Sequence, residues 1–242
     1  MSNTEKSLTD NPQGAGNILI TILLFGSVWG LLDALSVKTL SSFAGNFFCS
    51  RGICTCPLTG IVFGFFIMAA ALAIFRKPVI LIGIGTVAAL FKLLNFTVIT
   101  LPVVNGNIIY QPVMNPAIAT FVTSLVFALM AVLLQKSIAG NIYFRIIVGL
   151  IAGFLSAIAF VYTTFYITHT HPLIVDEPWQ FIIPFHGPVS AILGGVFLPL
   201  GYLTGIVTRQ KAALLQTGKK GAFYLLTCFT IVLCIVVSTL TA

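Results

Sequence analysis

The stretch TGIVFGFFIMAAALAIFRKPVILIGIGTVAALFKLLN, residues 59–95, decides the fold. It consists of two apolar runs, 59–76 and 78–95, each close to the ~20 residues that a helix needs to cross a bilayer. They meet at Arg76-Lys77-Pro78, and proline suits the first turn of a helix because its missing N–H would have no helical partner there. The stretch therefore predicts two antiparallel membrane-spanning helices joined by a very tight turn.

The composition agrees with this prediction. Hydrophobic residues make up 58% of the 242 residues and charged residues only 7%, and the mean hydropathy is +1.09. A water-soluble domain of this composition would expose very large apolar patches. We therefore expect an integral membrane protein, whose net charge of +7 faces anionic lipid headgroups rather than nucleic acid.

Seven apolar runs follow one another along the chain. The expected spans are 18–37, 59–76, 78–95, 116–135, 143–168, 187–208 and 221–241. Basic residues concentrate in the loops after the second, fourth and sixth runs: Arg76, Lys77, Lys136, Arg145, Arg209, Lys211, Lys219 and Lys220. By the positive-inside rule the N-terminus and these loops are cytoplasmic, and the C-terminus is outside. The predicted fold is an all-α, polytopic helical bundle in the plasma membrane.

The chain divides into three segments. Residues 1–16 are polar and predict a disordered cytoplasmic tail, residues 17–208 a six-helix membrane core, and residues 209–242 a basic cytoplasmic loop with a seventh transmembrane helix. No P-loop, nucleophile elbow or metalloprotease motif occurs in the sequence. The sequence therefore predicts neither an enzyme nor a cofactor.

Two ionisable residues lie well inside the predicted spans, Asp33 in the first and Lys92 in the third. Counted from the cytoplasmic ends of their helices, both lie at a depth of roughly 21–23 Å. Buried charges in a membrane are expected to pair or to line a polar cavity, and they often mark a functional site. Asn95 lies one turn beyond Lys92, so these residues predict either a structural ion pair or the floor of an external ligand site.

Two other features suggest where a ligand binds. Asn115-Pro116 and His186-Gly187-Pro188 resemble helix starts that face the outside, where free N–H groups favour an anionic group. Ordinary helix capping explains the same pattern. Tyr110 and Trp179, in the adjoining external loops, are expected to pack on an apolar or aromatic ligand.

The external loops also hold groups that can bind metals or form disulfides. Cys49, Cys54 and Cys56 in the first loop do not have the spacing of a zinc site, so disulfides, free thiols, soft-metal binding and redox catalysis all remain open. His169 and His171 in the fifth loop either bind a metal or gate a pocket.

Small residues recur at four-residue spacing on two helices and allow close helix packing in lipid. On the first helix they are Gly26, Gly30 and Ala34, and on the fifth they are Gly149, Gly153 and Ala157. This spacing, the run LLFGSVWGLLDA at 23–34 and the segments VAALFKLLN at 87–95 and MNPAIA at 114–119 carry a family resemblance. The chain resembles the substrate-binding S components of energy-coupling factor transporters, or S-component-like membrane proteins of unassigned substrate.

The resemblance has several implications. It assigns Gly26, Gly30 and Ala34 to the face that contacts a membrane coupling subunit, which cytoplasmic ATPases drive. It implies a vitamin, a vitamin precursor or a metal ion as cargo, taken up from outside. The seventh helix departs from the six helices usual in the family.

Three functions from different classes follow from the sequence. The first is a solute-binding membrane subunit of an importer, with Asp33, Lys92, Asn95, Asn115 and His186 at the base of the site. The second is a membrane thiol oxidoreductase or redox-linked protein that uses the external cysteines. The third is a membrane scaffold or assembly protein.

Overall fold

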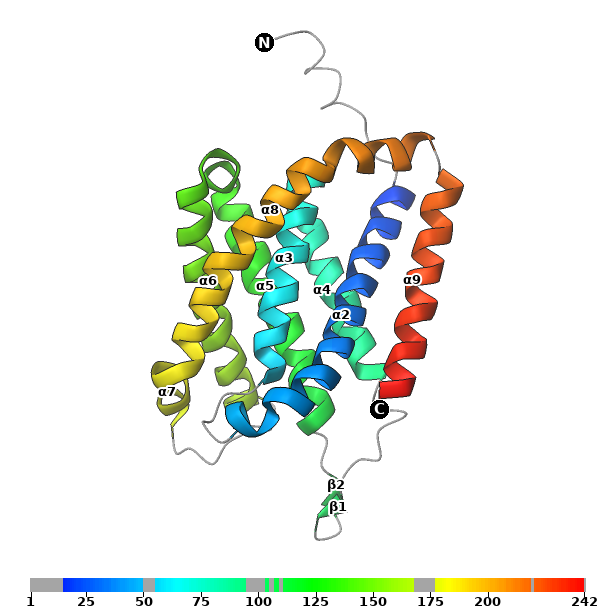
Figure 1. Cartoon of the computed structure of the whole chain (residues 1–242). Helices are drawn as coiled ribbons and strands as arrows, with labels where there is room; N and C mark the ends of the chain where they lie inside the picture. The colour runs from blue at the N-terminus through cyan, green and yellow to red at the C-terminus, as the bar shows by residue number, and fades with distance from the viewer. Residues whose placement is uncertain are drawn as a thin grey trace.

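The computed structural model of the chain describes residues 15–49, 55–94, 103–104, 107–108, 111–167, 177–218 and 220–241. Seven long helices stand side by side in one bundle (Figure 1), which confirms the predicted helical bundle. They are α2 (Ala15–Cys49), α3 (Thr55–Phe75), α4 (Val79–Leu94), α5 (Gln111–Gly140), α6 (Ile142–Tyr162), α8 (Gly187–Gly218) and α9 (Lys220–Thr241).

Short elements gather at one end of this bundle, which we call the α7 end (Figure 1). They are the π-helical turns η2 (Thr163–Ile167) and η3 (Ile182–His186), the one-turn helix α7 (Pro178–Phe181), and an antiparallel pair of two-residue strands, β1 (Val103–Val104) and β2 (Asn107–Ile108). The opposite end carries the α3–α4 turn at Arg76, and we call it the Arg76 end.

Within the described ranges, four helical stretches are long and apolar enough to cross a membrane: Leu58–Phe75, Met114–Gly140, Ile142–Ile167 and Pro178–Arg209. Three shorter apolar stretches accompany them: Ile18–Asp33, Val79–Leu93 and Gly221–Val237. Together they coincide with the seven apolar runs of the sequence.

The predicted turn between α3 and α4 is confirmed. Arg76 follows α3 directly, donates its N–H to the Leu72 carbonyl at 2.9 Å, and has a positive φ of 54° that reverses the chain. The Gln135 side chain of α5 donates to the Arg76 carbonyl at 2.9 Å and holds the turn. Beyond the turn, α2 and α5 each pack against both α3 and α4. As a result, α3 and α4 make few contacts with each other.

The apolar core surrounds α3. Phe65 and Met68 of α3 are fully buried, as is Trp29 of α2, whose ring lies against Gly64. On the opposite side, Gly201 and Gly205 of α8 leave no room for a side chain against the α3 backbone. Small residues therefore let α3 sit at the centre of the bundle in contact with its neighbours.

Close packing at small residues also joins α6 to α8. Gly149 faces the backbone of Gly194, and Gly153 faces the backbone of Ser190, so neither position can take a methyl group without moving the helices apart. The prediction of close helix contact at Gly149 and Gly153 is confirmed.

The first helix is longer than predicted. Instead of ending at residue 37, α2 continues to Cys49, and its last turns lie across the α7 end of the bundle (Figure 1). Cys49 is the last residue of α2 and Cys56 is the second residue of α3. The prediction that both cysteines lie in a loop was therefore wrong, because the turns that exceed the bilayer-crossing length remain helical.

The two predicted helix starts were also wrong. α5 begins at Gln111, with Pro112 in its first turn, so Asn115 lies inside the helix and Pro116 interrupts its hydrogen-bond ladder. On α8 the helix is continuous from Pro178 through the π turn η3, and the Gly187 N–H donates to the Ile182 carbonyl. Neither site presents the free helix N-terminus that the proline patterns suggested.

Candidate functional site

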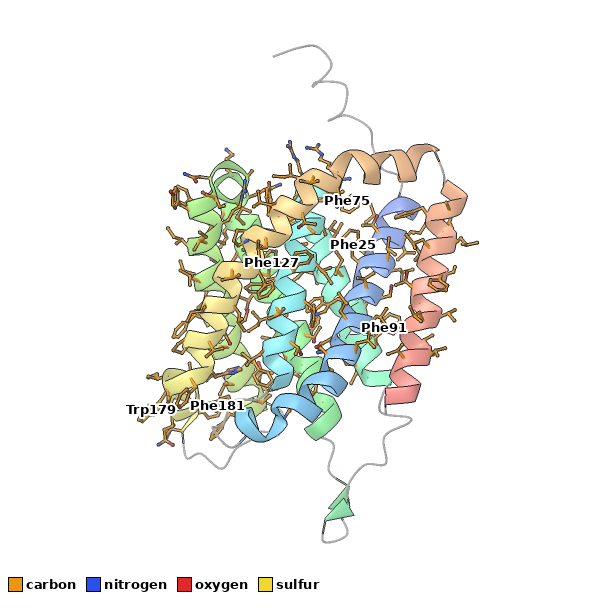
Figure 2. The ribbon with its side chains drawn as sticks, viewed as in Figure 1. Phe25, Phe75, Phe91, Phe127, Trp179 and Phe181 are labelled. Carbon is orange, nitrogen blue, oxygen red and sulfur yellow. The ribbon has the colours of Figure 1, made fainter. Side chains whose placement is uncertain are left out.

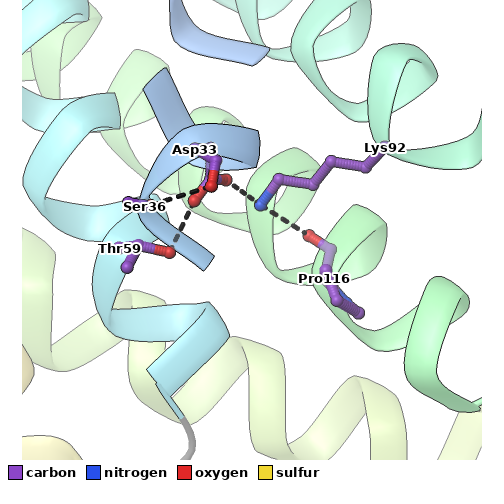
Figure 3. A network of polar contacts seen from close by, with 5 residues as sticks. All are labelled: Asp33, Ser36, Thr59, Lys92 and Pro116. Carbon is purple, nitrogen blue, oxygen red and sulfur yellow. Dashed lines mark hydrogen bonds and ion pairs between the residues drawn. The ribbon is translucent and has the colours of Figure 1, made fainter. Parts of the chain in front are cut away.

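A buried ion pair lies between α2 and α4 near the α7 end. The Lys92 ammonium pairs with Oδ2 of Asp33, and the side chains are 10% and 0% exposed (Figure 3). The depths counted along the two helices had predicted that these residues could meet, and the ion pair is confirmed. Two charges taken out of water are stable only when they compensate each other and find further hydrogen bonds.

Two further contacts complete this network. The Thr59 hydroxyl of α3 donates to Oδ1 of Asp33 at 2.5 Å, and Lys92 donates to the Pro116 carbonyl of α5 at 3.4 Å (Figure 3). Ser36 donates to the Asp33 backbone carbonyl at 2.8 Å and shapes the same turn of α2. Four helices, α2 to α5, therefore meet at one compensated pair of charges.

Other buried polar atoms of the described residues have no hydrogen-bond partner. They are Trp29 Nε1, Thr120 Oγ1, Ser156 Oγ, Ser190 Oγ and both ring nitrogens of His186. Each such atom costs about 1–3 kcal/mol if it stays unsatisfied, and native proteins contain few of them. They come from α2, α5, α6, η3 and α8, so they are spread over several helices of the bundle.

His186 is the most distinctive member of this set. Its ring is fully buried, stacks on Phe181 at 4.9 Å between centroids and lies 5.9 Å from the Phe160 ring. A neutral imidazole carries one donor and one acceptor. His186 therefore brings both kinds of hydrogen-bonding atom into an aromatic environment.

Metal chemistry finds no support among these groups. Within the described ranges, no three side chains of His, Cys, Asp or Glu lie close enough together to hold a metal ion. Of the predicted candidates, His169, His171 and Cys54 fall outside the described residues, as do the side chains of Cys49 and Cys56.

The other predicted ligand-binding residues have different positions. Asn115 is buried beside Pro116, close to the Lys92 contact. Trp179 is 53% exposed on α7 (Figure 2), so it does not lie with Asp33 and Lys92. Asn95 and Tyr110 lie outside the described residues.

The small residues of α2 face neighbouring helices of the same chain. A methyl group on Gly26 would overlap Val87 of α4, and one on Gly30 would meet Phe91 of α4 and Cys234 of α9. The side chain of Ala34 is outside the described residues. The seventh helix thus covers part of the face that the resemblance assigns to a coupling subunit.

Sequence reasoning missed Thr59, Thr120, Ser156 and Ser190. Their only signal in the sequence is a small polar side chain within an apolar span. Many similar threonines in this chain simply donate to their own helix, as Thr86 does to Ile82. The sequence alone therefore does not distinguish a small polar side chain that donates to its own helix from one that belongs to the candidate site.

The candidate site thus combines a compensated charge pair with unpartnered, uncharged polar groups in the interior of one apolar helical bundle. Comparison with known proteins adds no assignment: no family model, no curated protein and no solved structure matches this chain.

Proposed function

We propose that this chain is an integral membrane subunit that binds a small solute inside the bundle, near the α7 end. The observation that carries the proposal is the set of buried polar atoms without partners inside the same bundle that holds the buried Asp33–Lys92 pair. A bound solute that hydrogen-bonds to them would satisfy these donors and acceptors and remove the free-energy cost of leaving them without partners.

The outer surface of α6 supports the insertion in a membrane. Tyr143 and Tyr162 are both exposed and stand nineteen residues apart on this helix, which corresponds to about 28 Å at 1.5 Å per residue. Every exposed residue between them is apolar: Phe144, Ile146, Ile147, Leu150, Ile151, Phe154 and Leu155. Amphipathic aromatic residues separated by the thickness of a hydrocarbon core are typical of a helix that crosses a bilayer.

The proposed orientation places the α7 end outside the cell. Arg76, Lys77 and Lys136 are exposed at the opposite end, whereas Glu177 is exposed at the α7 end. Basic loops favour the cytoplasmic side. A reporter that requires the external side, fused after Ala242, should be active, and the same reporter inserted after Lys77 should not.

The proposed transport role includes energising partners, which rest on the family resemblance. Gly30 lies against Cys234 of α9, so a partner helix could reach that part of α2 only after α9 moves. The buried threonines of α9 do not bind it to its neighbours by these hydroxyls. Thr227 and Thr230 donate to the Phe223 and Leu226 carbonyls of α9 itself. We therefore propose that docking of a coupling subunit displaces α9.

The decisive experiment is to release and identify a retained solute. The full chain is purified in mild detergent and denatured, and the supernatant is analysed by mass spectrometry. We expect one small molecule in near-stoichiometric amount, and at least a tenfold smaller amount from the Ser190→Ala and His186→Phe variants. Thr204→Val is the matched control, because the Thr204 hydroxyl is exposed and donates to Leu200 of its own helix. If the unaltered chain and the variants all release nothing, solute binding is refuted.

A further inference from the structure

Thr120 on α5 differs from the other threonines of the bundle. Six described threonines donate their hydroxyl to the carbonyl four residues earlier: Thr86, Thr164, Thr204, Thr208, Thr227 and Thr230. For Thr120 that carbonyl belongs to Pro116, which accepts from Lys92 and receives no hydrogen bond from the Thr120 hydroxyl. The Thr120 hydroxyl is fully buried and has no partner, so it is free to hydrogen-bond to a ligand.

Among the described residues, this hydroxyl faces a position of α3 that carries no side chain. At every other buried glycine described, an added methyl group would come within 3.0 Å of another atom. At Gly60 of α3, the nearest described atom outside the helix itself is Thr120 Oγ1, at 3.8 Å. The unpartnered hydroxyl therefore points to a position where the central helix has no side chain.

The charge balance of this region restricts the ligand. Asp33 and Lys92 compensate each other, and the unpartnered atoms belong to uncharged donors and acceptors: an indole, hydroxyls and an imidazole. A charged ligand would arrive without a counter-charge in a region enclosed by apolar helices, which disfavours its binding. An uncharged ligand with donors and acceptors would satisfy the hydroxyls and leave the ion pair intact.

We propose that the solute is an uncharged polar molecule, with both hydrogen-bond donors and acceptors, held beside Gly60 by the Thr120 hydroxyl while Asp33 and Lys92 remain paired. This inference rests on the proposed function and narrows its cargo. It excludes a metal ion and an anion as the ligand of this site.

The test measures binding of defined probes to the full chain in detergent. Uracil, nicotinamide and glycerol serve as uncharged probes, phosphate and benzoate as anions, choline as an organic cation and Co²⁺ as a metal ion. The readout is the melting temperature at increasing probe concentration, together with mass spectrometry of any molecule that the purified chain releases. We expect an uncharged probe or released molecule to bind, and Thr120→Val to weaken its binding at least tenfold.

Two further variants locate the site. Gly60→Leu fills the space beside Thr120 and should abolish binding, whereas Gly140→Leu is the matched control, because no atom lies within 4 Å of its added methyl group. Thr120→Val changes only the hydroxyl, so it tests the site even if Gly60→Leu does not fold.

The outcomes separate the two proposals. If only a charged probe binds, or if an uncharged one binds equally well to wild type, Thr120→Val and Gly60→Leu, then the present inference fails and solute binding stands. If nothing binds and the purified chain releases no small molecule, both proposals fail together.

Discussion

Lys92 and Pro116 are 24 residues apart in the chain, and the Lys92 ammonium donates to the Pro116 carbonyl oxygen at 3.4 Å. This contact fixes α4 to α5 at the point where a proline interrupts the α5 ladder. The Pro116 carbonyl lies four residues before Thr120, so one lysine both pairs with Asp33 and contacts the turn of α5 that carries the unpartnered Thr120 hydroxyl. The Lys92 contact and the unpartnered hydroxyl are therefore neighbours on α5.

The ion pair should show strong coupling in a double-mutant cycle. Lys92→Met leaves the Asp33 carboxylate buried without a counter-charge and should cost about 3–5 kcal/mol of stability. Asp33→Leu combined with Lys92→Met removes both charges and should cost less than either single change. The measurement is the free energy of unfolding in mixed micelles; additive single effects would show that the two residues act independently.

Thr59 should contribute through its hydrogen bond to a charged group. Thr59→Val keeps the shape of the side chain and removes the donor to Asp33, so we expect a loss of about 1.5–3 kcal/mol. Thr86→Val is the control, because its hydroxyl donates only to the Ile82 carbonyl of the same helix, and it should change stability by no more than about 0.5 kcal/mol. Equal losses for the two variants would show that the Asp33 contact adds nothing.

The sequence predicted the ion pair because helix geometry is regular. Asp33 lies 15 residues beyond the predicted helix start at 18, and Lys92 lies 14 residues beyond the predicted start at 78, so a constant rise per residue brings them to one level. The residues at which the helices start were less predictable. Proline fits the first turn of a helix, but Pro116 and Pro188 are each preceded by another proline, Pro112 and Pro178, nearer the true start.

The unpartnered groups could not be predicted for a different reason. In helices that are apolar on all sides, periodicity does not show which face is buried. Ser156 and Ser190 look the same in the sequence whether they face lipid or the interior, and only the packing of α6 on α8 at Gly153 decides it. Tertiary contacts therefore determine the site more than local pattern does.

Arg145 should stabilise the Arg76 end of the bundle. This buried side chain donates from Nε to Ile138 O at 2.7 Å and from its Nη2 to Ala139 O at 3.2 Å, and its guanidinium stacks over Tyr202 at 4.3 Å. Arg145→Met should cost about 2–3 kcal/mol through the loss of charge-assisted hydrogen bonds.

The Arg145→Lys variant tests whether a positive charge alone provides the stabilisation that Arg145 gives. A lysine ammonium is a point charge without the planar fork, so it should recover less than half of the loss. Lys136→Met, at an exposed position nearby, should stay within about 0.5 kcal/mol of the wild type. Full recovery by lysine, measured by thermal unfolding in detergent, would refute the role of the fork geometry.

Gly153 should set the distance between α6 and α8. An added methyl group would overlap the Ser190 carbonyl and the Ala191 Cα, both parts of a backbone that cannot move without shifting α8, so Gly153→Ala should cost about 1–3 kcal/mol. Gly140→Ala meets no atom within 4 Å and should be neutral or stabilising by about 0.4–1 kcal/mol, because alanine restricts the unfolded chain. Because α8 carries Ser190 and continues from His186, the separation forced by Gly153→Ala should also reduce retained solute, whereas Gly140→Ala should not. Unfolding free energy and mass spectrometry on both variants give the answer, and equal stability of the two would show that the helices are not in close contact at Gly153.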